Sequence, residues 1–263
     1  MTAVPPLIAF AHVGKSFDGG RVLAVDDVSL EVAEGEFLAI VGGSGSGKTT
    51  LLRLANRLID ADAGSIMVEG DDVRAVDPVS LRRRIGYVFQ SGGLFPHMSV
   101  AGNIGITPKL LGEGAAEIAA RVDELLDLVR LERAPYRDRF PHELSGGQRQ
   151  RVGVARALAA QPRIVLMDEP FGALDPLTRD AIGDDYRAAH KKLGLTTLMI
   201  THDMTEAILL ADRVAVMRAG RLLAQGTPAE LSNSDDAYVG ELLRTPRRQA
   251  ERLKVLLPRD GAA

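Results

Sequence analysis

A glycine-rich octapeptide at residues 42–49 constrains the fold of this chain more than any other part of the sequence. A short unbroken apolar run at residues 37–41 precedes it directly, as expected for a strand buried on both faces of a parallel sheet. Good helix formers without a breaker, residues 49–55, follow it. In this order of strand, loop and helix, successive backbone N–H groups can surround a phosphate. The sequence therefore predicts an α/β fold with a phosphate-binding loop.

The side chains of this loop suit a nucleoside triphosphate. Its glycines allow backbone N–H groups to face one anion, Lys48 adds a mobile charge for the outer phosphates, and Thr49 offers a hydroxyl to Mg²⁺. Gly/Ser-rich turns are common, but the complete pattern between a strand and a helix favours phosphate binding. The pattern does not distinguish ATP from GTP. The predicted nucleotide-binding residues here are Gly42, Gly43, Ser44, Gly45, Ser46, Gly47, Lys48, Thr49 and Thr50.

Two further apolar runs end in polar residues that we expect at the same sheet edge. Residues 164–167 lead to Asp168 and Glu169. Because adjacent carboxylates are unfavourable without a cation, we expect Asp168 to support Mg²⁺. Strand alternation would turn Glu169 the other way, toward a water for which it acts as general base. The alternative is an acidic pair that caps the next helix.

His202 and Gln90 are weaker candidates for the same edge. His202 follows the apolar run 196–201, and a ligand is expected at the carboxyl ends of parallel strands, which favours contact with a γ-phosphate. A lone histidine is more often structural. Gln90 follows a strand-like run at residues 86–89, where its amide can reach Mg²⁺ or the attacking water.

A second glycine-rich segment, residues 144–148, precedes a helix-forming run at residues 148–160. A hydroxyl, backbone N–H groups and a helix N-terminus would together form an anion site from Ser145, Gly146, Gly147 and Gln148. The alternative is a helix cap in which Ser145 and Gln148 form a capping box, and both interpretations can hold together. One γ-phosphate does not need two glycine-rich cradles from one polypeptide, so we expect a dimer.

The composition excludes several classes of protein. With 263 residues, 46% of them hydrophobic, the chain can bury the core of one domain with subdomains. A net charge of -3 provides no basic field, so a nucleic-acid partner is not expected. The absence of cysteine excludes disulfides and thiolate metal sites. The first residues lack the pattern of a signal peptide, and no apolar run approaches the ~18 residues of a membrane span, so any membrane contact is expected through a partner.

The sequence pattern predicts three parts in the chain. Residues 1–90 and 161–232 are predicted to form an α/β core that a hairpin at residues 214–224 closes. Residues 91–160 are predicted to form a helical insertion, and residues 233–263 a short C-terminal helical extension with a helix at residues 238–257. The insertion shows an apolar helix face formed by Ile118, Val122, Leu125, Leu126 and Val129. The extension carries Arg244, Arg247, Arg248, Arg252 and Lys254, which favour a solvated face, with an acidic lipid or partner as the alternative.

Taken together, these motifs resemble the ATP-binding subunit of an ABC transporter over about residues 7–232. The resemblance rests on the phosphate loop, Gln90, residues 144–148 and 164–169, Ala173-Leu174-Asp175 and His202. It implies a P-loop NTPase (RecA-like) core with a mostly parallel sheet, an N-terminal antiparallel β portion and an inserted helical subdomain. It also implies an ATPase that uses ATP and Mg²⁺, with Thr49, Gln90 and Asp168 near the metal.

The resemblance implies further roles for individual residues. Phe17 would stack on adenine. Ser145 and Gly147 would complete the site of the opposite subunit in a head-to-tail homodimer, with Asp175 at the interface. The segment after Gln90 resembles the surface that receives the coupling helix of a membrane permease.

Less universal stretches resemble the importer ATPases for glycine betaine, choline, carnitine and related osmoprotectants. They are residues 56–59, 77–88, 93–98, 108–111 and 168–176. This resemblance implies a peripheral subunit on the cytoplasmic face of the cell membrane, with integral permease subunits and, indirectly, a solute-binding protein as partners. About 30 residues follow the cassette, so the regulatory CBS modules of many such ATPases are not expected.

Other classes remain as alternatives. A DNA-repair ATPase would need a long coiled-coil insertion, whereas only 97 residues lead from Lys48 to Ser145. A translation-associated protein would usually carry two cassettes and basic linkers. An ATPase of another importer, or of an exporter or lipid transport system, stays open because the ATPase chemistry encodes neither direction nor cargo.

Overall fold

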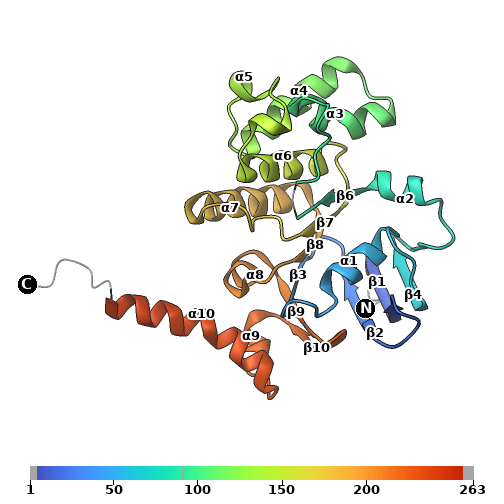
Figure 1. The fold of residues 1–263 in the computed structure, drawn as a ribbon, viewed down its shortest axis with the longest axis vertical. Coiled ribbons are helices and arrows are strands. Elements are labelled where there is room, and N and C mark those ends of the chain that lie inside the picture. The colour runs from blue at the N-terminus through green and yellow to red at the C-terminus, as the bar shows by residue number, and fades with distance from the viewer. Residues whose placement is uncertain (1–4, 91, 257–263) are drawn as a thin grey trace, which may run out of the picture.

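The computed structural model describes residues 5–90 and 92–256, so Leu257, the predicted end of the last helix, lies outside the described residues. Two sheets form the α/β part of the protein (Figure 1). The first is antiparallel, with the strand order β2-β1-β4-β5, and confirms the predicted N-terminal antiparallel portion. Its strands are β1 (Ile8–Ser16), β2 (Leu23–Val32), β4 (Ala63–Val68) and β5 (Asp71–Asp72).

The second sheet has six strands in the order β10-β9-β3-β8-β7-β6. All neighbours are parallel except β10, which pairs antiparallel with β9 and forms the predicted hairpin. The strands are β3 (Phe37–Val41), β6 (Ile85–Val88), β7 (Ile164–Asp168), β8 (Thr196–Ile200), β9 (Arg213–Arg218) and β10 (Arg221–Gly226).

Both faces of this sheet are buried, as the unbroken apolar runs predicted. Leu38 and Ile40 of β3 face a core that contains helix α1 (Lys48–Ala55) and the antiparallel sheet. Phe37 and Ala39 face the opposite core, which the later helices cover. Helix α1 therefore lies between the two sheets and directly follows the loop that begins at the end of β3.

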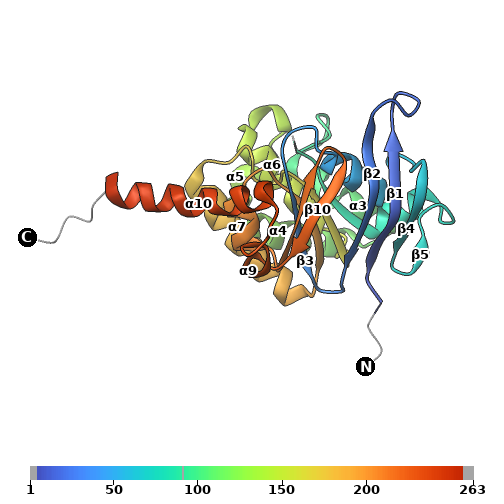
Figure 2. The same cartoon turned by 90° about the horizontal axis from the view of Figure 1, so that it is seen from below.

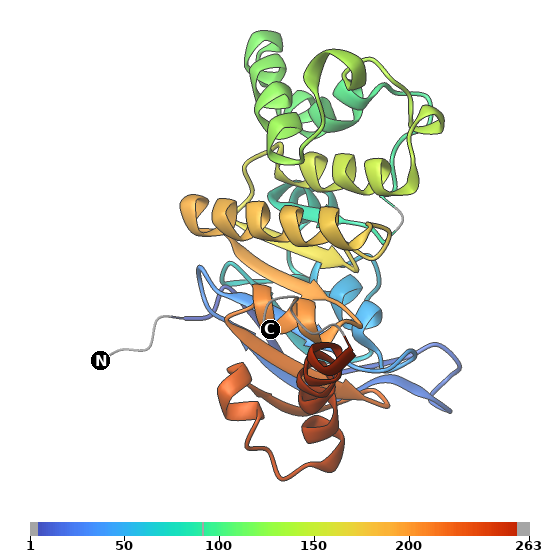
Figure 3. The same cartoon turned by 90° about the vertical axis from the view of Figure 1, so that its left-hand side faces the viewer.

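The chain between β6 and β7 is helical and stacks on one side of the parallel sheet (Figure 3). Helix α4 buries Val122, Leu125 and Leu126, as its apolar periodicity predicted. Helix α6 lies nearest to the sheet, with Val152 and Ala155 in the core. The elements here are α3 (Val100–Leu111), α4 (Ala115–Leu128), α5 (Arg133–Tyr136), the 3₁₀ turn η1 (Pro141–Glu143) and α6 (Gly146–Leu158); α2 (Pro78–Arg84) precedes β6.

Four further helices complete the fold: α7 (Pro176–Leu193), α8 (Met204–Leu210), α9 (Pro228–Leu231) and α10 (Ala237–Leu256). Helix α10 leaves the body on the side opposite to α2 in Figure 1 and opposite to β1, β4 and β5 in Figure 2. Its first turns bury Val239 and Leu243, and its last ten described residues are exposed. Among the described residues, no helix combines the length and apolarity that a membrane crossing requires.

Candidate nucleotide site

The phosphate loop joins β3 to α1 and approaches its neighbours so closely that two positions require glycine. A Cβ on Gly42 would lie 2.1 Å from the carbonyl oxygen of Met217, and a Cβ on Gly47 would lie 2.1 Å from that of Ala24. Both glycines also have positive φ, 152° and 97°. Residues 43–45 at the tip of the loop are exposed. The loop is thus pressed against strands β2 and β9 while its tip faces solvent.

Lys48 is buried and folds back on the loop. Its ammonium donates hydrogen bonds to the carbonyl oxygens of Gly42, at 2.8 Å, and Gly43, at 3.0 Å, and to Ser46 Oγ, at 3.3 Å. Burial lowers the pKa of Lys48, and the nearby carboxylates of Glu169 and Asp168 oppose this shift. A buried ammonium within a loop of glycine backbone suits an anion with several oxygens, such as a polyphosphate, for which it would exchange its bonds to the loop carbonyls.

Thr49 and Asp168 connect the loop to the end of β7. Thr49 Oγ1 donates a hydrogen bond to Asp168 Oδ1 at 3.1 Å. Asp168 is only 4% exposed, and burial raises its pKa. A buried carboxylate beside a hydroxyl is a donor pair that suits Mg²⁺, which uses few protein ligands and retains waters or phosphates. The described residues contain no cluster of three or more Asp, Glu, His or Cys side chains that would bind a metal alone.

Glu169 lies at the centre of the polar cluster. Its Oε2 accepts a hydrogen bond from Gln90 Nε2 at 2.9 Å and lies 3.3 Å from His202 Nδ1. The four carboxyl-edge residues predicted to act together, namely Gln90, Asp168, Glu169 and His202, therefore lie at the same edge of the sheet, beside the loop. The resulting arrangement places a carboxylate, held by an amide and an imidazole, next to the predicted phosphate position.

The prediction that strand alternation orients Glu169 is wrong. Strand β7 ends at Asp168, and Glu169 has a left-handed backbone with φ of 48°. Its backbone N–H donates to the carbonyl of Ile200 at 2.9 Å, which holds the residue against β8. The left-handed backbone at Glu169, rather than the alternation of side chains along a strand, separates the carboxylates of Asp168 and Glu169.

Gln150 is a buried residue of this site that the sequence analysis missed. It is 1% exposed; its Nε2 donates to the carbonyl of Glu169 at 2.7 Å, and its Oε1 accepts from the N–H of Ala173 at 3.0 Å. The left-handed turn at Glu169 is thereby fixed from α6. The sequence carried one signal that could have predicted this role. The amide of Gln150 lies on the same helix face as Val154 and Ala157, where the pattern otherwise places apolar residues.

The segment 144–148 lies apart from this cluster. Ser145 caps α6: its Oγ accepts from the N–H of Gln148 at 3.2 Å, and Gln148 Oε1 accepts from the N–H of Ser145 at 2.9 Å. The capping-box alternative is therefore confirmed. Ser145 and Gly146 are exposed, Gly147 is half-buried, and within residues 5–90 and 92–256 no hydrogen bond joins this segment to the phosphate loop.

The other two predicted residues also lie at exposed positions. Phe17 follows the end of β1, and 66% of it is exposed, with Lys15 Nζ 5.5 Å from its ring centre. Asp175 is the N-cap of α7 and accepts from the N–H of Thr178 at 3.0 Å. The hydrogen bonds from Thr178 lower the pKa of Asp175. Both side chains are available to a ligand or a partner.

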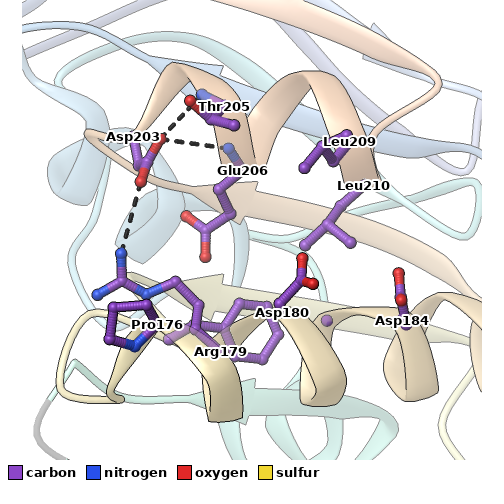
Figure 4. A pocket seen from close by; sticks show the side chains of 11 residues that line it. Pro176, Arg179, Asp180, Asp184, Asp203, Thr205, Glu206, Leu209 and Leu210 are labelled. Carbon is purple, nitrogen blue, oxygen red and sulfur yellow. Dashed lines mark hydrogen bonds and ion pairs between the residues drawn. The ribbon is translucent and has the colours of Figure 1, made fainter. Parts of the chain in front are cut away.

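A cavity of about 400 Å³ lies between α7 and α8, next to His202 in the chain. Asp203 caps α8 by accepting from the N–H groups of Thr205 and Glu206, and it pairs with Arg179 of α7 at 3.5 Å (Figure 4). Glu206 points into the same cavity, and burial raises its pKa to about 7. Thr201, Arg179 and His202 oppose this shift, while Asp203 adds to it.

These features define the class of the protein as a nucleotide-binding cassette of the P-loop NTPase type. A family model described as "ABC transporter" matches residues 25–172, and the chain belongs to this family. The chain is 48% identical over 242 residues to the choline transport ATP-binding protein OpuBA of Bacillus subtilis, covering 92% of this chain and 63% of that protein. It is 50% identical over 222 residues to the glycine betaine uptake system ATP-binding protein YehX of Escherichia coli, covering 84% of this chain and 71% of that protein.

The fold is also similar to that of a solved structure, the dimeric post-hydrolysis state of the ATP-binding cassette MJ0796 bound to ADP and Pi. The TM-score is 0.78 and the identity 30%, over 84% of this chain and 98% of that one. The α/β P-loop fold with its parallel sheet and antiparallel portion agrees with the fold expected from the sequence.

The cavity generates a prediction on stability and pH. The folded pKa of Glu206, about 7, exceeds its ordinary value of 4.5, so folding favours the protonated form. The resulting stabilisation is complete below about pH 4.5 and is lost as the pH rises through 7. The change Glu206→Gln should therefore leave stability less dependent on pH, with the variant gaining about 2 kcal/mol relative to the original chain between pH 5 and pH 8.

Urea unfolding at several pH values measures this difference. Asp184→Asn is the matched control, because it removes a carboxylate from an exposed position on the rim of the same cavity. Parallel pH profiles for the original chain and Glu206→Gln would contradict the assignment.

Proposed function

We propose that this chain is the ATP-hydrolysing subunit of an ABC importer. The observation that supports the proposal best is the meeting of Thr49, Asp168, Glu169, Gln90 and His202 beside one phosphate loop. In this proposal residues 1–90 and 161–232 hold the nucleotide, residues 91–160 present the segment 144–148, and residues 233–263 form a short C-terminal helical extension.

Each residue of the cluster has a role in binding or proton transfer. Lys48 would exchange its bonds to the loop carbonyls for bonds to the outer phosphates, and Phe17 would stack on adenine. Bound Mg²⁺ would neutralise phosphate charge, with Thr49, Gln90 and Asp168 as the residues that hold it. Glu169 would accept a proton from the attacking water while Gln90 and His202 orient its carboxylate. Phosphoryl transfer depends mainly on positioning and charge, which a rigid polar cluster provides.

A second copy of the chain would complete each site. Ser145 and Gly147 stand at the exposed N-terminus of α6, where a helix end and its backbone N–H groups suit a γ-phosphate. Because they lie apart from the cluster of their own chain, we propose that they serve the opposite subunit in a head-to-tail homodimer, with Asp175 at the interface. The dimeric form of the similar cassette MJ0796 supports this arrangement.

A groove beside the end of β6 would receive the membrane permease. Phe89, Phe95 and Leu110 line it and are 40%, 43% and 55% exposed. The guanidinium of Arg156 lies 5.8 Å from the ring centres of both phenylalanines, within the range of a cation–π contact. This exposed apolar groove, next to Gln90, fits a short helix of the permease and would place the chain peripherally on the cytoplasmic face of the cell membrane.

We propose a quaternary-amine osmoprotectant, such as choline, glycine betaine or carnitine, as the cargo. The similarity to OpuBA and YehX supports this choice, although the chain spans only 63% of the length of OpuBA. The solute would contact the permease and a binding protein rather than this chain.

The change Glu169→Gln should lower ATP turnover about a hundredfold or more while MgATP binding persists, because the proton acceptor is lost and the phosphate contacts remain. The trapped ATP state should accumulate as a dimer in size-exclusion chromatography with MgATP. Glu34→Gln, which removes an exposed carboxylate paired with Arg163, is the matched control. A Glu169→Gln variant with normal turnover and no dimer would overturn the general-base assignment.

Mixing two inactive variants tests the shared site. Lys48→Ala should lose nucleotide binding, and a variant with Ser145→Arg should fail to complete the opposite site. A heterodimer of the two retains one site with intact Lys48 and Ser145, so it should keep about half of the activity of an original dimer. In an equal mixture about half of the dimers are heterodimers, so mixing should restore about a quarter of the original activity by subunit counting. An ATPase titration at a constant total concentration measures this recovery, and no recovery at any ratio would contradict the arrangement in trans.

Reconstitution tests the cargo. The chain is purified with the permease and solute-binding protein that copurify with it, and ATP hydrolysis in vesicles is measured with choline, glycine betaine or carnitine. We expect severalfold stimulation by a quaternary amine, which an aromatic cage of the binding protein would recognise, and none by sulfate or an unmethylated amino acid. Stimulation by sulfate alone would refute the cargo while leaving the ATPase assignment intact.

A further inference from the structure

The first turn of α10 contacts the phosphate loop, although nearly two hundred residues separate them in sequence. The hydroxyl oxygen of Tyr238 accepts a hydrogen bond from the backbone N–H of Gly43 at 3.1 Å. The guanidinium of Arg218, the last residue of β9, lies 4.7 Å from the ring centre of Tyr238. The phenol is therefore held between a loop amide on one side and a cation on the other.

Two backbone contacts beside this bond also hold the loop from the side of the β9–β10 hairpin. The backbone of Gly42 is pressed against Met217, and the N–H of Gly220 donates to the carbonyl of Ser46 at 3.1 Å. Both of these neighbours belong to the β9–β10 hairpin region. The contact with Tyr238 is made by a side chain and acts at the N–H of Gly43, in the exposed part of the loop, whereas Lys48 bonds to the carbonyl oxygen of the same residue.

The start of α10 is rigid enough to position the phenol. The carboxylate of Asp236 accepts from the N–H groups of Tyr238, at 2.9 Å, and Val239, at 3.0 Å. Val239 is fully buried and Leu243 nearly so, which anchors the first two turns in the core. A capped and buried helix turn holds the ring in place. The bond to Gly43 therefore restricts the movement of the phosphate loop, because the ring does not move with the loop.

We infer that Tyr238 is a positioning residue for the phosphate loop, which it holds in the conformation that receives the triphosphate. The inference rests on the proposed function. Tyr238 acts through Gly43 and does not reach the cluster formed by Glu169 and its partners, so it should affect nucleotide binding and not the hydrolytic step. A loop that is ordered before binding costs less conformational entropy when the ligand arrives.

The change Tyr238→Phe tests the inference because it removes the hydroxyl and keeps the ring that stacks on Arg218. Hydrogen exchange on the nucleotide-free protein should show faster exchange at the Gly43 amide. The KM for ATP, and the Kd of a non-hydrolysable ATP analogue, should rise roughly three- to tenfold, the effect of one neutral hydrogen bond, while kcat stays within about twofold.

Tyr186→Phe is the matched control. It also removes one phenol hydrogen bond, between Tyr186 and Thr197 in the buried core at 2.8 Å, but it does not touch the loop. It should lower stability and leave both the exchange at Gly43 and the KM for ATP unchanged. A rise in KM for this control equal to that of Tyr238→Phe would assign the effect to stability and overturn the inference.

Two results with Tyr238→Phe overturn the inference directly: unchanged exchange at Gly43, or a KM that stays the same, with or without a fall in kcat. These outcomes are distinct from failure of the proposed function. If the original chain neither binds nor hydrolyses ATP, the proposed function fails, whereas the exchange of Gly43 without nucleotide still decides whether Tyr238 holds the loop.

Discussion

The backbone pairing of β3, β8 and β7 determines where the chemistry of this protein can occur. Ile40 of β3 pairs with Ile200 of β8, and Ile200 pairs with Asp168 of β7. The three strands therefore end at the same edge of the sheet, and the phosphate loop, His202 and Glu169 all follow directly from that edge. A shift of one residue in either pairing would turn Asp168 to the opposite face and separate the carboxylate from Thr49.

The electrostatics of the site depend on this alignment. Asp168 is buried, and the same burial that raises its pKa also lowers that of Lys48, so each charged form is disfavoured in the protein alone. The hydrogen bond from Thr49 and the charges of Lys48 and Arg53 compensate Asp168 only in part, since its pKa remains raised. In the proposed function, a polyphosphate would supply the charge that Lys48 lacks and its cation the charge that Asp168 lacks, so binding would compensate a desolvation cost that folding created.

The sequence predicted the order of the motifs well because each depends on local chemistry. The apolar run at residues 37–41, the glycine loop and the helix after Lys48 are contiguous, and their geometry follows from steric rules. Strand alternation was the wrong basis for orienting Glu169, since a left-handed residue at the end of a strand carries no sequence signal when the residue is not glycine. Gln150 and Tyr238 were missed because their partners, Glu169 and Gly43, come from distant segments and only the folded chain brings them together.

Helix α6 contributes to two parts of the molecule, the exposed segment 144–148 and the polar cluster around Glu169. Its N-cap residue Ser145 is exposed. One and a half turns later, Gln150 donates a hydrogen bond to the backbone carbonyl of Glu169 in the same chain. If α6 moves as a rigid body, a ligand that binds at the cap would also shift the turn that carries Gln150. In a head-to-tail dimer, the two nucleotide sites would then be mechanically coupled, and closure of one site would depend on the other.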